Sequence, residues 1–370
     1  MTSTTFCCVK SVVPSERAMA NNTVQPLSFL ATADAGLVDE ETSTVVTDSL
    51  LPFSITLFLT STMAIAANTF MIASTIKSKA LRRKRSTHFT VNFLISSAST
   101  AISCLNIVGL SWIDNSAEED AKISPFVWTV LFGLLWNFGI SHYFTSCTLA
   151  LTRLMAMMWP LKYQRLMSSK IAGVLIIFPW MFSGFICMPA FYGVLGKPDS
   201  KMLEFTPSYK RSEKVRAMAY MATSVGGPVV IACIAYAAMF IQATRSQSAT
   251  NSHEFGNHHH ISQWQSGLTR ALLANIIIHL SCNIPHAIIH AVDSFNKNHV
   301  FKATIHVICS VQYILDPLMF FIVAQEYRKA GLELLNFVFR RSQRSVPTTS
   351  ESNGASHRMK TSVLQNTCDL

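Results

Sequence analysis

The sequence has little charge for its length. Only 14% of its 370 residues are charged, whereas 50% are hydrophobic, and ordinary soluble domains carry about 25% charged residues. Most of the Lys, Arg, Asp and Glu residues fall between long apolar blocks. This composition is typical of a membrane protein, which needs no soluble core.

Enzyme signatures are also missing. The chain contains no GxSxG, no phosphate-binding loop, no HExxH and no glycine-rich dinucleotide turn. Asp316 is the only carboxylate well inside an apolar block, which excludes proteolysis by paired membrane aspartates. A channel or ion-coupled transporter would need more buried charge and internal repeats. We therefore expect no enzyme, no catalytic residues and no cofactor.

Metal-binding and nucleic-acid patterns are weak. The nine cysteines have no CxxC spacing, so neither a zinc site nor a disulfide framework is expected, although Cys7 and Cys8 remain open to oxidation. Residues 258–260 are three consecutive histidines, which could bind a metal. No acidic or Cys residue is spaced to act as a further ligand, so we interpret the tract as solvated. The net charge of +10 comes from basic residues in short loops and after the last block, which fits a membrane surface better than nucleic acid. The sequence predicts no metal site and no nucleic-acid partner.

Seven apolar blocks are present, each about as long as the 20 residues that a helix needs to span a bilayer. We place these spans at 51–76, 88–112, 124–157, 170–195, 217–243, 266–292 and 301–324. Residues 1–50 form a tail, 325–339 alternate basic and apolar residues as an amphipathic helix on the membrane surface does, and 340–370 are rich in Ser and Thr and expected to be disordered.

Basic residues predict the orientation. They concentrate in 77–85, 162–170 and 328–344, and Lys and Arg in short loops favour the cytoplasmic side. The basic loop 196–216 breaks this pattern, but the majority places the N-terminus outside and the C-terminus in the cytoplasm. The sequon at Asn21 is then a glycosylation candidate.

Arg153 closes the third apolar block. From the block alone, two interpretations are open: a snorkelling side chain that marks the helix end, or a functional charge at the membrane edge. Seven residues later stands Pro160, which begins Pro160-Leu161-Lys162-Tyr163. The other spans hold further landmarks in order: Asn68, Trp180, Pro228 with Tyr236, Cys282-Asn283-Ile284-Pro285 and Asp316-Pro317-Leu318-Met319-Phe320.

Together these motifs resemble those of rhodopsin-like (class A) G-protein-coupled receptors over about 51–340. The resemblance implies an all-α integral membrane protein, a seven-transmembrane helix bundle with a short amphipathic helix after the seventh span, in the plasma membrane. It implies an extracellular ligand, a heterotrimeric G protein and possible arrestin and receptor-kinase partners. It assigns coupling and activation to Arg153, Thr152, Pro160, Tyr236, Asp316, Pro317 and Phe320, and a polar core to Asn68, Ser97, His142 and Asp316.

Departures from the family pattern are as informative as the matches to it. Thr152 occupies the acidic position before Arg153, which predicts raised basal activity because the Arg lacks its usual resting partner. Ser97 replaces the Asp at the centre of the family's sodium site. Trp128 replaces the outer cysteine of span three, and the 196–216 loop contains no cysteine, so the usual outer disulfide cannot form.

Polar residues form a stripe along one face of span six, at Asn275, His279, Asn283, His286, His290 and Asp293. A polar stripe in lipid must face protein or water. Interhelical hydrogen bonding is favoured for Asn275 and His279. By resemblance, Asn283, His286 and His290 are ligand-pocket candidates, with Trp136 and Asn137.

A further hypothesis concerns the interior. Asp316, with His142, replaces the sodium pocket by a proton-based or hydrogen-bonded pair, although ordinary interhelical bonding explains both residues equally well.

No Asp occurs between Phe126 and Leu151, so the ligand is expected to be a peptide or a small molecule other than a biogenic amine. The alternative function is a seven-span protein that has lost G-protein coupling and has a structural or interaction role.

Overall fold

The computed structural model describes residues 39–118, 121–191, 197–199, 204–206, 215, 219–220, 222–250, 259–291 and 299–344. By its contacts the chain divides into Met1–Val46 and Thr47–Leu370, and the elements described below belong to the second unit except for the first residues of α1, 39–46. Asn21, Cys7, Cys8 and residues 345–370 of the tail expected at 340–370 lie outside the described residues.

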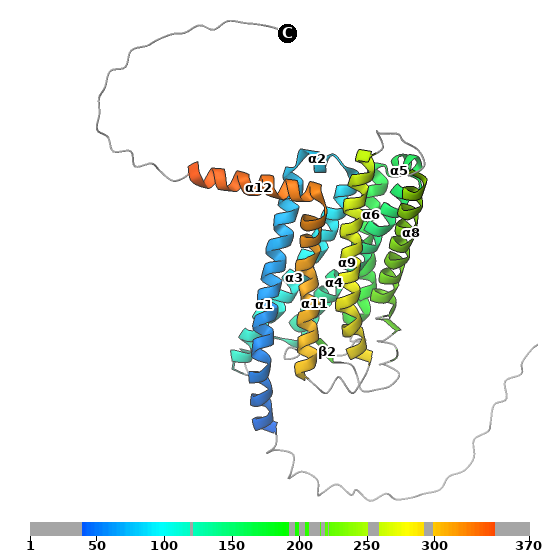
Figure 1. Cartoon of the computed structure of the whole chain (residues 1–370). Coiled ribbons are helices and arrows are strands. Elements are labelled where there is room, and N and C mark those ends of the chain that lie inside the picture. Colours follow the sequence, from blue (N-terminus) through cyan, green and yellow to red (C-terminus); the bar gives the residue numbers. More distant parts are fainter. Residues whose placement is uncertain are drawn as a thin grey trace, which may run out of the picture. The chain divides into compact units, whose positions relative to one another are not determined.

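Helices make up nearly all of the described chain, and the long ones run side by side in a bundle (Figure 1). The long helices are α1 (Asp39–Lys77), α3 (Arg85–Ser116), α4 (Pro125–Met158), α6 (Ser169–Phe191), α8 (Gly227–Thr250), α9 (His259–Ala291) and α11 (His299–Val323). Short elements join them: α2 (Lys79–Arg82), α5 (Pro160–Leu166), the π-helix η2 (Ala222–Gly226), and the antiparallel strands β1 (Lys197–Asp199) and β2 (Glu204–Thr206). The all-α expectation is confirmed, with one small hairpin added.

Five stretches of the described helices are long and apolar enough to cross a membrane: Leu51–Lys77, Arg85–Ser116, Ser169–Pro189, Ala222–Gln242 and Val300–Val323. Helices α4 and α9 are not among them. Both carry polar residues near their middle, His142 on α4 and His279 on α9, and these side chains are buried inside the bundle. Their polarity therefore faces protein, which is where a polar group within a membrane has to lie.

Helix α4 lies at the centre of the bundle. It packs on α3, α6 and α8, while α9 packs on α11 and α11 also touches α3. An apolar core fills the half of the bundle near α12, with Phe93, Leu149, Met239, Leu272 and Phe320 among its buried members. This arrangement lets α4, α9 and α11 present side chains to one another.

Helix α12 (Gln325–Arg344) runs across the end of the bundle that also carries α2 and α5, called here the α12 end (Figure 1). Tyr327 anchors it, because its ring is buried 5.6 Å from that of Phe320. Lys84 adds an ion pair of 2.7 Å with Glu326. The amphipathic segment expected at 325–339 is helical through Arg344.

The opposite end, called here the β end, is closed without a cystine among the described residues. Trp128 is buried there with Ile107 and Phe132. Asp114 accepts a 2.6 Å hydrogen bond from the backbone N–H of Ile123 and so secures the connection from α3 to α4. The six described cysteines, from Cys104 to Cys309, are all free.

Candidate functional site

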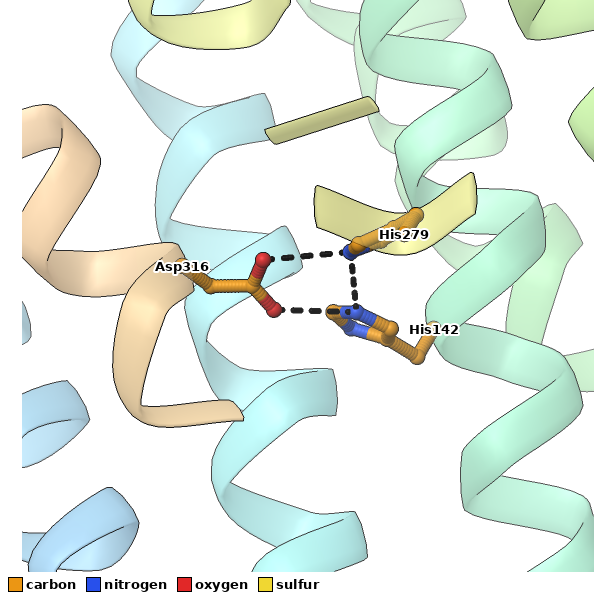
Figure 2. Close-up of side chains that lie close together, drawn as sticks. All are labelled: His142, His279 and Asp316. Atoms are coloured by element: carbon orange, nitrogen blue, oxygen red, sulfur yellow. Dashed lines mark hydrogen bonds and ion pairs between the residues drawn. The ribbon is translucent and has the colours of Figure 1, made fainter. Parts of the chain in front are cut away.

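Three ionisable side chains from three helices meet in the centre of the bundle (Figure 2). His142 on α4 and His279 on α9 place their Nε2 atoms 3.3 Å apart. Asp316 on α11 faces both, with Oδ2 3.1 Å from His142 Nε2 and Oδ1 3.1 Å from His279 Nε2. We call these residues the His-His-Asp cluster.

The cluster is fully enclosed. The side chains of His142 and Asp316 are 0% exposed and that of His279 is 2% exposed. The ring of Phe93 covers it, with its centroid 4.6 Å from that of His142. Burial of a charged group without a partner costs several kcal/mol. Each of these buried ionisable groups therefore needs the others as neighbours.

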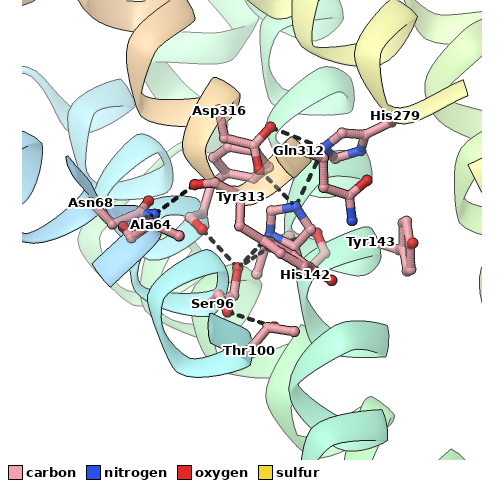
Figure 3. Close-up of polar contacts among 12 residues, drawn as sticks. Ala64, Asn68, Ser96, Thr100, His142, Tyr143, His279, Gln312, Tyr313 and Asp316 are labelled. Carbon is pink, nitrogen blue, oxygen red and sulfur yellow. Dashed lines mark hydrogen bonds and ion pairs between the residues drawn. The ribbon is translucent and has the colours of Figure 1, made fainter. Parts of the chain in front are cut away.

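A shell of hydroxyl groups supports the cluster (Figure 3). Ser96 Oγ on α3 lies 3.3 Å from His142 Nδ1 and 2.9 Å from Thr145 Oγ1. Ser96 also donates to the Phe93 carbonyl over 2.8 Å, and Thr145 donates to the His142 carbonyl over 2.8 Å. Helix α3 therefore reaches the cluster through a serine.

That serine is not the one singled out by sequence. Ser97 is buried, but its hydroxyl has no hydrogen-bond partner among the described residues. Asn68 links α1 to α11, because its Nδ2 donates to the carbonyls of Ala64, at 2.8 Å, and Tyr313, at 2.9 Å (Figure 3). The four polar-core candidates are thus all buried, but Ser97 takes no part in the cluster.

Towards the β end, a hydrogen-bonded group lies next to the cluster. Asn283 Nδ2 donates to Gln312 Oε1 over 2.8 Å and to the His279 carbonyl over 2.7 Å. Tyr143 donates to Asn283 Oδ1. This group carries a ligand-pocket candidate, Asn283, together with Gln312 from the polar stripe of the seventh span and Tyr143, which the sequence did not single out.

The other ligand-pocket candidates are spread more widely. His286 packs edge-on against the ring of His306 on α11, with centroids 5.0 Å apart. Trp136 packs on the apolar cluster of the β end, and Asn137 Oδ1 accepts a 2.8 Å hydrogen bond from Ser183 on α6. His290 belongs to α9, and its side chain lies outside the described part of the chain. Asn283 and His286 thus share a helix face, whereas Trp136 and Asn137 engage other neighbours.

Arg153 lies near the end of α4 (Pro125–Met158), in a partly aromatic setting at the α12 end. Only 8% of Arg153 is exposed, and Tyr163, Tyr236 and Tyr327 lie near its guanidinium. Burial raises the pKa of Tyr327, and the positive charge of Arg153 partly offsets that rise. Thr152 is also buried and donates to the Leu149 carbonyl over 2.9 Å.

Prolines shape the helices around these groups. Pro160 occupies the first turn of α5, directly after Trp159 caps α4. Pro317 lies inside α11, next to Asp316, and Pro285 lies inside α9. An internal proline removes one backbone hydrogen bond and permits a local bend. The helices that carry His279 and Asp316 are therefore among those with a weakened backbone ladder, as are α1 and α6.

The family's sodium ion does not fit these side chains. Hard cations favour oxygen ligands, whereas imidazole suits transition metals. The carboxylate expected on α3 is absent at Ser97, and two of the three groups that converge are imidazoles.

Comparison with known proteins defines the class. Residues 67–320 match the family model described as 7 transmembrane receptor (rhodopsin family). The crystal structure of squid rhodopsin has a TM-score of 0.64 to this chain at 13% identity, covering 83% of this chain and 93% of that one. At this identity the likeness shows the fold alone. No curated protein sequence matches the chain.

The protein is therefore a multi-pass membrane receptor with a seven-helix fold. More particularly, it belongs to the rhodopsin family of seven-transmembrane receptors, and it is not an enzyme.

Proposed function

We propose that this receptor converts binding of an extracellular ligand into activation of a heterotrimeric G protein. The observation that carries the proposal is the environment of Arg153, a largely buried guanidinium near Tyr163, Tyr236 and Tyr327 at the α12 end. Contacts between a guanidinium and neutral hydroxyls are weaker than a buried ion pair. Such a group is suited to exchange its contacts when a partner binds.

Coupling between the two ends runs through α9 and α11. A ligand shifts an equilibrium only by its differential affinity for two arrangements. Asn283 connects α9 to α11 by a hydrogen bond, and the His-His-Asp cluster brings α4, α9 and α11 together through His–Asp contacts of 3.1 Å, so a ligand that displaces Asn283 changes the contacts between these helices. Pro285 and Pro317 allow the bends that such a movement needs, and we assign Phe320, packed on Tyr327, to its transmission.

The ligand pocket is proposed at the β end, around Asn283, His286 and His290. Two imidazoles and an amide provide donors and acceptors without a fixed negative charge. This favours a peptide or an uncharged or acidic small molecule over an amine. The β end is then extracellular, and the α12 end faces the cytoplasm of the plasma membrane, where arrestin and a receptor kinase are further proposed partners.

Nucleotide exchange on purified G proteins tests the proposal. The full-length receptor in nanodiscs is expected to accelerate GTPγS binding to at least one member of a G-protein panel, and Arg153→Ala is expected to abolish this effect. Lys122→Ala, which alters an exposed cation far from Arg153 in sequence, is the matched control and should retain full activity. Lack of exchange with every G protein, with or without ligands found by screening, would favour the alternative of a structural or interaction role.

A further inference from the structure

The His-His-Asp cluster has the spacing of a metal site. A tetrahedral Zn²⁺ ion has ligand bonds of about 2.0–2.1 Å, which place neighbouring ligand atoms about 3.3 Å apart. The Nε2 atoms of His142 and His279 are 3.3 Å apart, and each lies 3.1 Å from an oxygen of Asp316. Two ring nitrogens and one carboxylate therefore converge, with one ligand atom from each residue and these atoms all within 4.8 Å of one another (Figure 2).

One atom of the cluster lacks a hydrogen bond of regular geometry. Asp316 Oδ2 lies 3.1 Å from His142 Nε2, and by geometric criteria it accepts no hydrogen bond from the described residues. This carboxylate oxygen is fully buried and points into the cluster. A buried oxygen without a donor carries an electrostatic penalty, which a cation placed between the three side chains would remove.

The neighbouring hydroxyls favour the tautomer that a metal requires. The protons of Ser96 and Thr145 both have carbonyl acceptors, at 2.8 Å each. Ser96 Oγ is then left to accept from His142 Nδ1, 3.3 Å away. This places the ring proton on Nδ1 and a lone pair on Nε2, directed at the lone pairs of Asp316. Metal-bound histidines are oriented in this way by a partner on their second nitrogen.

We propose that the receptor binds one Zn²⁺ ion through His142, His279 and Asp316, with Ser96 orienting the first histidine. Imidazole and carboxylate are both suitable zinc ligands. Because the three ligands come from α4, α9 and α11, the bound ion joins three helices at the centre of the bundle. The proposal concerns binding and stability, and it holds whether or not the receptor activates a G protein.

The competing occupant is a proton. A proton on His142 Nε2 would make an imidazolium that pairs with Asp316 and needs no metal. Two measurements distinguish these occupants. Only a bound metal can be quantified by elemental analysis of the purified protein, and only a bound metal can be replaced by an ion with visible absorption bands.

The test uses the full chain, purified without a histidine tag and with His258, His259 and His260 replaced by alanine to remove a competing tract. Metal content is measured by mass spectrometry after dialysis against zinc, and Co²⁺ is then added as an optical probe. One zinc per chain, the visible absorption bands of tetrahedral Co²⁺ and a rise in Tm on addition of Zn²⁺ are expected. Absence of bound zinc together with an unchanged Tm would overturn the proposal in favour of the proton.

Substitutions distinguish the three proposed zinc ligands from the serine that orients one of them. His142→Gln, His279→Gln and Asp316→Asn should each lose the stoichiometric zinc, whereas His286→Ala, which alters a histidine of the neighbouring pair, should retain it. Ser96→Ala should weaken zinc binding about 10- to 100-fold, the range found for partners of metal-bound histidines. Folding of each variant is checked by its metal-free Tm. Zinc retained by a folded Asp316→Asn or His279→Gln variant would overturn the assignment.

Discussion

Thr152 precedes Arg153 where the family carries an acid, and its replacement by aspartate tests how this receptor is held at rest. Thr152 is 4% exposed, and its hydroxyl donates a hydrogen bond of 2.9 Å to the Leu149 carbonyl. The side chain is thus satisfied within its own helix. Arg153 is 8% exposed and lies near three tyrosines, and a carboxylate at the neighbouring position would give it a charged partner.

The magnitude is set by two opposing effects. A hydrogen bond between charged groups contributes about 1.5–3 kcal/mol. Desolvation of a new carboxylate at the buried Thr152 site opposes it, although Arg153 is already largely removed from water. A net gain of about 1–2 kcal/mol for the resting arrangement corresponds to a factor of about 5–30 in the equilibrium. Thr152→Asp should therefore lower basal signalling about 5- to 30-fold.

The assay compares basal second-messenger output at matched surface expression, with GTPγS binding in membranes as a second readout. Thr152→Asn has the size of the aspartate variant without its charge and should leave basal output close to that of the natural receptor. Thr152→Val keeps the β-branch and removes only the hydroxyl bond to Leu149. Equal basal output from the natural receptor and Thr152→Asp, or an equal reduction in Thr152→Asn, would refute the charge-partner reasoning.

Three further substitutions probe other contacts. Trp180→Phe removes the 2.9 Å hydrogen bond from Trp180 Nε1 to Asn92 Oδ1 and should destabilise the bundle by about 0.6 kcal/mol, the average for such bonds in membranes, measured by thermal denaturation. Lys84→Glu should lower stability by under about 1 kcal/mol, because its ion pair with Glu326 is about one-third exposed, and the charge-swapped double variant should restore Tm. Asn283→Ala should raise the EC50 of any agonist found by screening about tenfold, the equivalent of one lost hydrogen bond, and an unchanged EC50 would exclude Asn283 from the pocket.

Much of the fold could be predicted from the sequence because a bilayer admits few solutions. Apolar blocks of span length have to be helices, and the order of the landmark residues along the chain already indicated the family. The hairpin of β1 and β2 was not predicted. Its strands have three residues each, too few to produce a period-2 pattern that stands out from a polar loop.

The site was harder to predict, since helical spacing identifies a face but not the neighbour that the face meets. The resemblance placed His142 and Asp316 together at the family's sodium pocket, and they lie 3.1 Å apart. The sequence favoured interhelical hydrogen bonding for His279, which lies within hydrogen-bonding distance of His142 and Asp316, but it did not indicate that His279 completes the cluster. Along the stripe of α9 every polar residue looks equivalent, and only the packing of α9 on α11 selects His279. The same limit explains why Ser97 was favoured over Ser96, a difference of one residue and thus about 100° around the helix.

The departures from the family pattern in the interior depend on one another. With no acid at Ser97, α11 carries a buried negative charge at the centre of the bundle, at Asp316. A carboxylate that is 0% exposed requires a cation or a proton close by, and the two histidines from α4 and α9 lie against the place of that occupant. Removal of one histidine leaves Asp316 poorly compensated, and removal of Asp316 leaves two imidazoles facing each other without an anion. The three residues therefore act as one unit, and its occupant decides how firmly α4, α9 and α11 are held together.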